Sequence, residues 1–213
     1  MSGGLWALVS TAALLGAVHT VIGPDHYLPF AFLARAGGWS RTKTMVVTLL
    51  CGVGHVASSV VLASVGIFLG LALSSLEVLG SVRGRVAAWV LVGFGLAYLA
   101  WGLRRAHTHS HPHAHPGAGR RLAPWALFIV FVLGPCEVLI PLLLYAAAAH
   151  GLAGACLAVA TFSAATLVSM LVTVWVVLQG LTRLPLGKLE RYAHAMAGAG
   201  LALCGAAVLF LGL

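Results

Sequence analysis

The sequence predicts an all-α, polytopic membrane protein with six transmembrane helices. Three observations support this fold class: 61% of the 213 residues are hydrophobic, the mean hydropathy is +1.05, and only 8% of the residues are charged. Soluble domains contain about 45–50% apolar and about 25% charged residues. Most of the surface of this protein is therefore expected to face lipid.

Six apolar runs are long enough to cross the hydrocarbon core of a bilayer, which takes roughly 20 residues. The first run has no positively charged stretch before it and continues into HTVIGPDH without a small-residue cleavage site. This pattern disfavours a cleaved signal peptide and favours a first transmembrane helix. The six runs cover residues 5–33, 44–73, 87–103, 125–149, 153–180 and 192–213.

The net charge of +8 is distributed unevenly between the runs. Ten lysines and arginines follow the first, third and fifth runs, and only Arg83 and Arg85 lie on the opposite side. Such a bias marks the cytoplasmic loops of membrane proteins. We therefore expect a bacterial-type inner membrane location with both termini outside. The same placement of charge indicates the lipid bilayer as a partner and disfavours nucleic acid.

The two halves of the chain are similar in sequence. VIGPDHYLPF at 21–30 resembles VLGPCEVLIPLL at 132–143, and residues 76–95 align without gaps with residues 181–200. An odd number of helices in each half places the two halves in opposite orientations. Inverted repeats with broken helices are typical of secondary transporters, whose sites lie near the bilayer midplane. We therefore predict two inverted three-helix repeats.

A histidine-rich linker separates the predicted repeats. The first repeat is expected at 1–105, the linker at 106–121 and the second repeat at 122–213. The linker is too rich in proline and glycine to pack, and histidine-rich tracts commonly bind metal. The charge bias makes it a cytoplasmic loop. Its predicted auxiliary metal-binding residues are His107, His109, His111, His113 and His115.

Each half begins with a helix that a proline is expected to break. Proline has no backbone N–H and clashes with the preceding turn. At membrane depth, such a break is tolerated where it is buried in protein or lines a wet cavity. Two of the four acidic residues, Asp25 and Glu137, lie at these breaks, and a buried charge there costs roughly 2.5–3.5 kcal/mol. The predicted helix-break residues are Gly23, Pro24, Gly134 and Pro135.

The residue types around the breaks are those that bind transition metals. His19 and His26 are seven residues apart, or about 10 Å along an unbroken helix. Either the break brings them together or they mark successive points on a path. Imidazole and thiolate favour nickel, cobalt, zinc or iron, whereas hard cations take oxygen ligands. The predicted metal-binding residues are His19, Asp25, His26, His55, Cys136 and Glu137.

The segment HTVIGPDH resembles the signature helix of the nickel/cobalt transporter families, in which the spacing is His-x4-Asp-His and here is His-x5-Asp-His. The histidine-rich loop is similar to that of bacterial nickel/cobalt efflux proteins. The two three-helix halves resemble the wider lysine-exporter superfamily, which includes transmembrane proteins of cytochrome c biogenesis. By this resemblance His19, Asp25 and His26 contact the metal. The implied substrate is nickel or cobalt, with zinc, iron or manganese as alternatives.

Three other functions fit parts of the sequence. In a transmembrane thiol-electron carrier, Cys136 would match one of the two redox cysteines, but Asp25 stands where the other would be. In an exporter of another small solute, or in a non-transporting accessory protein, the histidines would be incidental. An enzyme is not expected, because the sequence has no nucleophile–base pair or phosphate loop, and no organic cofactor is expected. A homo-oligomer is compatible with the sequence.

Overall fold

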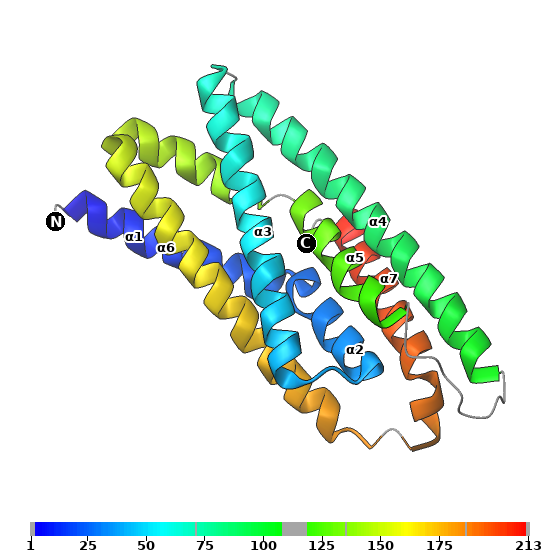
Figure 1. Cartoon of the computed structure of the whole chain (residues 1–213). Coiled ribbons are helices and arrows are strands. Elements are labelled where there is room, and N and C mark those ends of the chain that lie inside the picture. The colour runs from blue at the N-terminus through cyan, green and yellow to red at the C-terminus, as the bar shows by residue number, and fades with distance from the viewer. Residues whose placement is uncertain (1–2, 71, 108–118, 135, 186, 212–213) are drawn as a thin grey trace.

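The structure is a computed structural model that describes residues 3–70, 72–107, 119–134, 136–185 and 187–211 (Figure 1). Within these ranges every regular element is helical, so the all-α prediction is confirmed for them. The elements are α1 (Gly3–Ile22), η1 (Pro24–His26), α2 (Leu28–Gly37), α3 (Arg41–Phe68), α4 (Leu73–His107), α5 (Gly119–Leu133), α6 (Leu139–Arg183), η2 (Gly187–Tyr192) and α7 (Ala193–Leu211).

Five helical segments in the described part of the chain are long and apolar enough to cross a membrane. They are α1, α3, α4, α6 and the segment Leu189–Leu211, which contains α7. Large apolar side chains on these segments are exposed, among them Leu14, Trp89, Leu203 and Phe210. A surface this apolar is unfavourable in water. The structure therefore supports a polytopic membrane protein.

The first predicted run is interrupted where the sequence places the break. α1 ends at Ile22, and Gly23 has an extended conformation with φ −79° and ψ 101°. Pro24–His26 then form a single 3-10 turn, closed by a hydrogen bond of 3.1 Å from the His26 N–H to the Gly23 carbonyl. α2 begins two residues later, so this run consists of two helices joined by a short irregular segment.

The fourth predicted run, residues 125–149, also does not form one continuous helix. α5 ends at Leu133 and α6 begins at Leu139, so the apolar part of α5, Ala123–Leu133, is too short to span a membrane by itself. The interruption falls at the predicted second break, because Pro135 has no N–H to continue the helix. The described part of the chain therefore contains five helical segments of spanning length, where six apolar runs were predicted.

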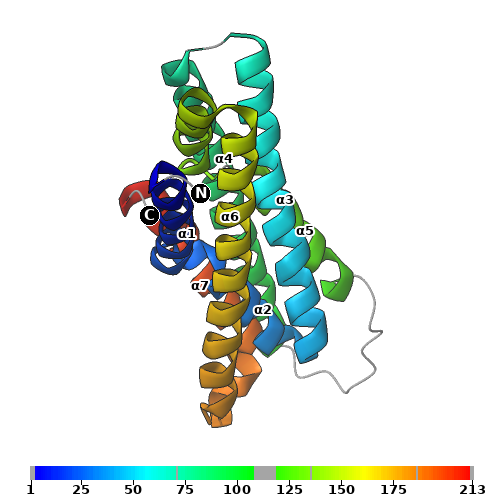
Figure 2. The same ribbon diagram turned by 90° about the vertical axis from the view of Figure 1, so that its left-hand side faces the viewer.

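α6 covers the remainder of that run and the whole of the fifth run, with a sharp bend between them. Gly151 has φ 64° and ψ −164°, a conformation that glycine adopts readily because it has no Cβ atom. Residues 139–150 and residues 152–183 thus form two legs. The bend lies near the same end of the bundle as the turn between α3 and α4 (Figure 2).

α4 and α7 lie side by side, and glycines allow their backbones to approach closely (Figure 1). A Cβ atom on Gly95 would contact the backbone of Ala202 and lie 2.8 Å from the carbonyl oxygen of Gly198. A Cβ atom on Gly198 would contact the backbone of Leu99. Small residues at such crossings are typical of membrane helices, which associate mainly through close packing.

Three connections meet at one end of the bundle (Figures 1 and 2). They are the turn between α2 and α3, the ends of α4 and α5 that flank the linker, and the segment between α6 and α7. The basic residues of the predicted cytoplasmic loops belong to these segments. The structure thus gathers them at one end, and the assignment of that end to the cytoplasm stays a prediction.

Candidate metal centre

Three histidines from separate elements converge inside the bundle. His19 lies in the last turn of α1, His26 in η1 and His55 in α3. One ring nitrogen from each lies within 4.8 Å of the other two, and this is the only such group of three among the described residues. The ring centroids are 4.7 Å apart for His19 and His26, and 5.2 Å apart for His26 and His55. We call these three residues the histidine cluster.

The first helix break brings His19 and His26 together. The extended Gly23 and the 3-10 turn that follows shorten the separation of about 10 Å that a continuous helix would impose on the two residues. Of the two arrangements that the sequence left open, the structure supports close approach rather than successive points on a path.

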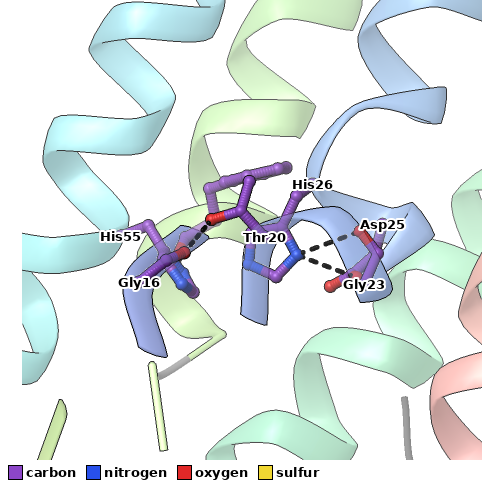
Figure 3. A network of polar contacts seen from close by, with 7 residues as sticks. Gly16, Thr20, Gly23, Asp25, His26 and His55 are labelled. Carbon is purple, nitrogen blue, oxygen red and sulfur yellow. Dashed lines mark hydrogen bonds and ion pairs between the residues drawn. The ribbon is translucent and has the colours of Figure 1, made fainter. Parts of the chain in front are cut away.

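Asp25 contacts Nδ1 of the His26 ring. Its Oδ1 lies 3.1 Å from Nδ1 of His26, and the Gly23 carbonyl oxygen lies 3.2 Å from the same nitrogen (Figure 3). Both oxygens are acceptors, so Nδ1 carries a proton, and in the neutral imidazole Nε2 keeps its lone pair. Histidines that bind metal commonly donate their second N–H to a carboxylate or carbonyl in this way. This geometry gives Asp25 a positioning role, which differs from the direct ligand that was predicted.

The second helix break positions His55. Nδ1 of His55 lies 3.3 Å from the carbonyl oxygen of Phe131, at the end of α5. In a continuous helix that carbonyl would accept from the N–H of residue 135, but residue 135 is proline and has none. The imidazole of His55 therefore supplies the missing donor, and this leaves its Nε2 as an acceptor.

Two further polar groups of the second break are also satisfied from neighbouring helices. The Val132 carbonyl accepts a hydrogen bond of 2.9 Å from Arg83, and the Cys136 N–H donates to Ser59 Oγ over 2.6 Å. Backbone groups without a partner are costly away from water. α3 and α4 thus stabilise the break through side chains of the first half.

The Nε2 atoms of all three cluster histidines are buried and have no hydrogen-bond partner among the described residues. His26 and His55 are only 3% and 5% exposed, so bulk water does not hydrogen-bond to their Nε2 atoms. A buried polar atom without a partner in the protein is rare, and a bound ligand such as a metal ion would satisfy all three nitrogens. Three imidazoles with one open position are a common ligand set for a divalent transition metal.

A cavity of about 440 Å³ lies next to the histidine cluster and contains both acidic break residues in its wall. Asp25 and Glu137 line it together with all three cluster histidines, and so does Arg85 of α4. Glu137 is exposed and is not part of the cluster. The structure therefore places Glu137 beside the site, where it can attract a cation, and not within ligand distance of the three imidazoles.

Cys136 is not brought to the cluster, although it was predicted as a ligand. Its side chain is fully buried in an apolar group that includes Leu8, Val56 and Phe162, and it does not line the cavity. Neighbouring residues in a chain point in different directions, and here Glu137 faces the cavity while Cys136 faces the core. The thiol is not in a disulfide.

The histidine-rich linker falls mostly outside the described residues. His107 ends α4, and its ring lies 6.4 Å from that of Tyr192. The predicted auxiliary ligands His109, His111, His113 and His115 belong to the part of the chain that is not described. Their role in metal binding stays a prediction.

Two contributors to the site were missed in the sequence. The first is the Phe131 carbonyl, and the rule that a proline leaves the carbonyl four residues before it without a donor could have identified it. The second is the steric role of Gly23, since a Cβ atom there would lie 2.6 Å from Nδ1 of His26 and 2.8 Å from Oδ1 of Asp25. No local signal pairs Phe131 with His55, because the two are 76 residues apart.

Comparison with known proteins gives no match for this chain: no family model, no curated protein and no solved structure matches it. The resemblance to the nickel/cobalt transporter families therefore stays a prediction.

Replacing Gly23 by alanine is expected to weaken metal binding without unfolding the protein. The added Cβ atom would meet both groups of the Asp25–His26 hydrogen bond, so one of them has to move. Loss of such an outer contact typically costs about 10–100-fold in metal affinity. Isothermal titration of purified protein with Ni²⁺ or Zn²⁺ measures this change. Gly180→Ala is the matched control, because nothing lies within 4 Å of a Cβ atom there, and an equal loss in it would contradict this account.

Proposed function

We propose that this protein is a membrane transporter of a divalent transition metal ion. The observation that supports this most directly is the convergence of three imidazoles inside an apolar helical bundle, with buried Nε2 atoms that have no partner among the described residues. Buried polar groups are costly in a membrane protein and are typical of substrate pathways. A purely structural role would leave the three nitrogens uncompensated.

The ligand set supports a transition metal over a hard cation. Imidazole binds nickel, cobalt, zinc and copper well, while magnesium and calcium require oxygen ligands. Asp25 and the Phe131 carbonyl fix the orientation of two of the rings, so less rearrangement is needed when an ion binds. Nickel or cobalt is the preferred substrate because of the HTVIGPDH resemblance, with zinc, iron and manganese as alternatives.

The proposal includes six membrane crossings arranged as two inverted repeats. α5 together with residues 139–150 of α6 would form a broken fourth crossing, the counterpart of α1 and α2. Residues 152–183 would then form the fifth crossing. Both breaks contribute to one site, the first through His26 and the second through the Phe131 carbonyl, which supports a site at the interface of the repeats.

Transport in liposomes tests the proposal. Purified protein would be reconstituted, and nickel, cobalt, zinc, iron and manganese would be offered separately with a metal-sensitive dye inside the vesicles. Flux of at least one of these ions above protein-free vesicles is expected. If none of them crosses or binds, the protein is not a transition-metal transporter. Cys136→Ser is expected to keep full flux, because its thiol lies away from the cluster.

Asp25 variants distinguish a positioning role from a direct ligand. Asp25→Asn keeps a hydrogen-bond acceptor for Nδ1 of His26, whereas Asp25→Ala removes it. We expect Asp25→Ala to lower metal affinity about 10–100-fold, the range for outer-sphere partners, and Asp25→Asn to lower it less. Titration calorimetry on both variants measures the difference. Equal, complete loss of binding in the two would instead identify Asp25 as a ligand.

Removal of the histidine-rich linker is expected to lower the number of metal ions bound while leaving transport intact. Deletion of residues 107–115 removes five histidines that can collect metal but are separate in sequence from the histidine cluster. Equilibrium dialysis measures the stoichiometry, and the liposome assay measures flux. A deletion variant that binds no metal at all would show that the linker, and not the cluster, is the main site.

A further inference from the structure

A second cavity lies at the C-terminal end of α2, whereas the helix break lies at its N-terminal end. This is also the end of the bundle where the basic connections meet. It has a volume of about 310 Å³ and lies between the α2–α3 turn and the last turns of α6. Its wall combines basic, aromatic and neutral polar side chains. Among these side chains are Arg35, Trp39, Arg41, Trp175, Gln179 and Thr182.

Two guanidinium groups face this cavity with incomplete partners. Nε of Arg35 is buried and has no hydrogen-bond partner among the described residues, and its NH1 lies 3.9 Å from Oε1 of the exposed Glu190. NH2 of Arg41 donates to Gln179 Oε1 over a long 3.4 Å. None of the described residues that line the cavity is acidic. The cavity therefore has spare donors and positive charge.

The aromatic residues of this cavity favour a position at the level of lipid headgroups. Trp39 and Trp175 line it, and Nζ of Lys43 lies 4.7 Å from the Trp39 ring centroid. Tryptophan is enriched at membrane–water interfaces, and basic pockets between membrane helices bind phosphate-bearing headgroups. Trp175 is 51% exposed, so this wall of the cavity reaches the surface of the bundle.

An apolar surface continues from the cavity along α6. Val168, Val172 and Val176 are all more than half exposed, and they lie on the same face as Trp175 at helical spacing. A ligand with an anionic head and apolar tails would match both parts: the head between the two arginines, and the tails along this face. A free anion would bind only between the two arginines and would leave the apolar face of α6 uncovered.

We propose that this cavity binds the phosphate headgroup of an anionic phospholipid. Guanidinium groups suit this ligand because their planar donors match phosphate oxygens in pairs. Thr182 and Gln179 add neutral polar groups near the head. The site is independent of the histidine cluster, so it stands whether or not the protein transports metal.

Lipid-dependent thermal stability tests this site on the full chain in detergent. Wild-type protein is expected to gain stability on addition of phosphatidylglycerol and much less on addition of phosphatidylcholine. The double variant R35Q/R41Q is expected to bind phosphatidylglycerol at least five-fold more weakly by native mass spectrometry. R35K/R41K, which keeps the charge, should retain part of the binding. R183Q is the matched control, because Arg183 lies at the same end of α6 but does not line the cavity.

Three results would overturn the proposal. Equal stabilisation by phosphatidylcholine would show that the headgroup charge is not recognised. Equal loss in R183Q would show only a general effect of surface charge. Stabilisation by inorganic phosphate to the same extent as by phosphatidylglycerol would identify a site for the free anion. Circular dichroism of each variant would verify the helix content, and the charge-retaining variant keeps the test valid if R35Q/R41Q does not fold.

Discussion

Replacing His26 by alanine is expected to abolish both metal binding at the cluster and metal flux. His26 is the central member, since its ring lies near both His19 and His55, whose own centroids are 6.4 Å apart. Without His26, only the imidazoles of His19 and His55 remain as ligands. Asp25 also loses its partner, so a partly buried carboxylate in the cavity wall would lack its hydrogen bond to His26, which adds to the loss.

We expect the affinity to fall by at least about 100-fold, beyond the 10–100-fold range for an outer-sphere partner. His55→Ala should have a similar effect, because it also leaves the Phe131 carbonyl without its donor. Titration calorimetry and liposome flux measure both changes. His150→Ala is the control, since this histidine lies at the bend of α6 and outside the cluster. If His26→Ala protein transports metal at the wild-type rate, the cluster is not the pathway.

Replacing Gly95 by alanine is expected to destabilise the whole bundle. The new Cβ atom would contact the backbone of Ala202 and come within 2.8 Å of the Gly198 carbonyl, and backbone atoms cannot rotate away as a side chain can. α4 and α7 would have to separate along their contact. Overpacking typically costs 1–3 kcal/mol, and we expect about 3 kcal/mol here because the neighbour is rigid.

The melting temperature in detergent measures this effect. At about 2–4 °C for each kcal/mol, the midpoint should fall by roughly 6–12 °C. Gly93→Ala is the matched control on the same helix, because nothing lies within 4 Å of a Cβ atom there and alanine favours the helix by about 1 kcal/mol. A midpoint that falls equally in both variants would show that the destabilisation does not arise from the α4–α7 contact.

The parts of this structure that depend on local chemistry were predictable from the sequence. The apolar runs indicated membrane helices, and the dipeptides Gly23-Pro24 and Gly134-Pro135 indicated interruptions where α1 and α5 end. The membrane helices follow from composition, and the interruptions follow from the missing N–H of proline. The site was predictable in part for the same reason, since His19 and His26 flank a break.

The remaining features depend on contacts between distant segments. The aligned segments 76–95 and 181–200 include Gly95 and Gly198, but the alignment does not indicate that these two residues lie against each other. Likewise, the pairing of His55 with the Phe131 carbonyl requires α3 to lie beside α5. Adjacent residues such as Cys136 and Glu137 could not be assigned to core or cavity, because the irregular backbone between α5 and α6 has no fixed periodicity.

X-ray absorption spectroscopy of the metal-loaded protein tests the central claim most directly. The measurement would use protein lacking residues 107–115, so that the linker histidines do not contribute, loaded with one equivalent of Ni²⁺, Co²⁺ or Zn²⁺. The account predicts about three imidazole ligands, at about 2.0–2.1 Å when the ion is Zn²⁺, and loss of this signature in His26→Ala. A spectrum with no imidazole ligands, or one that is unchanged in His26→Ala, would contradict the assignment of the histidine cluster as the metal site.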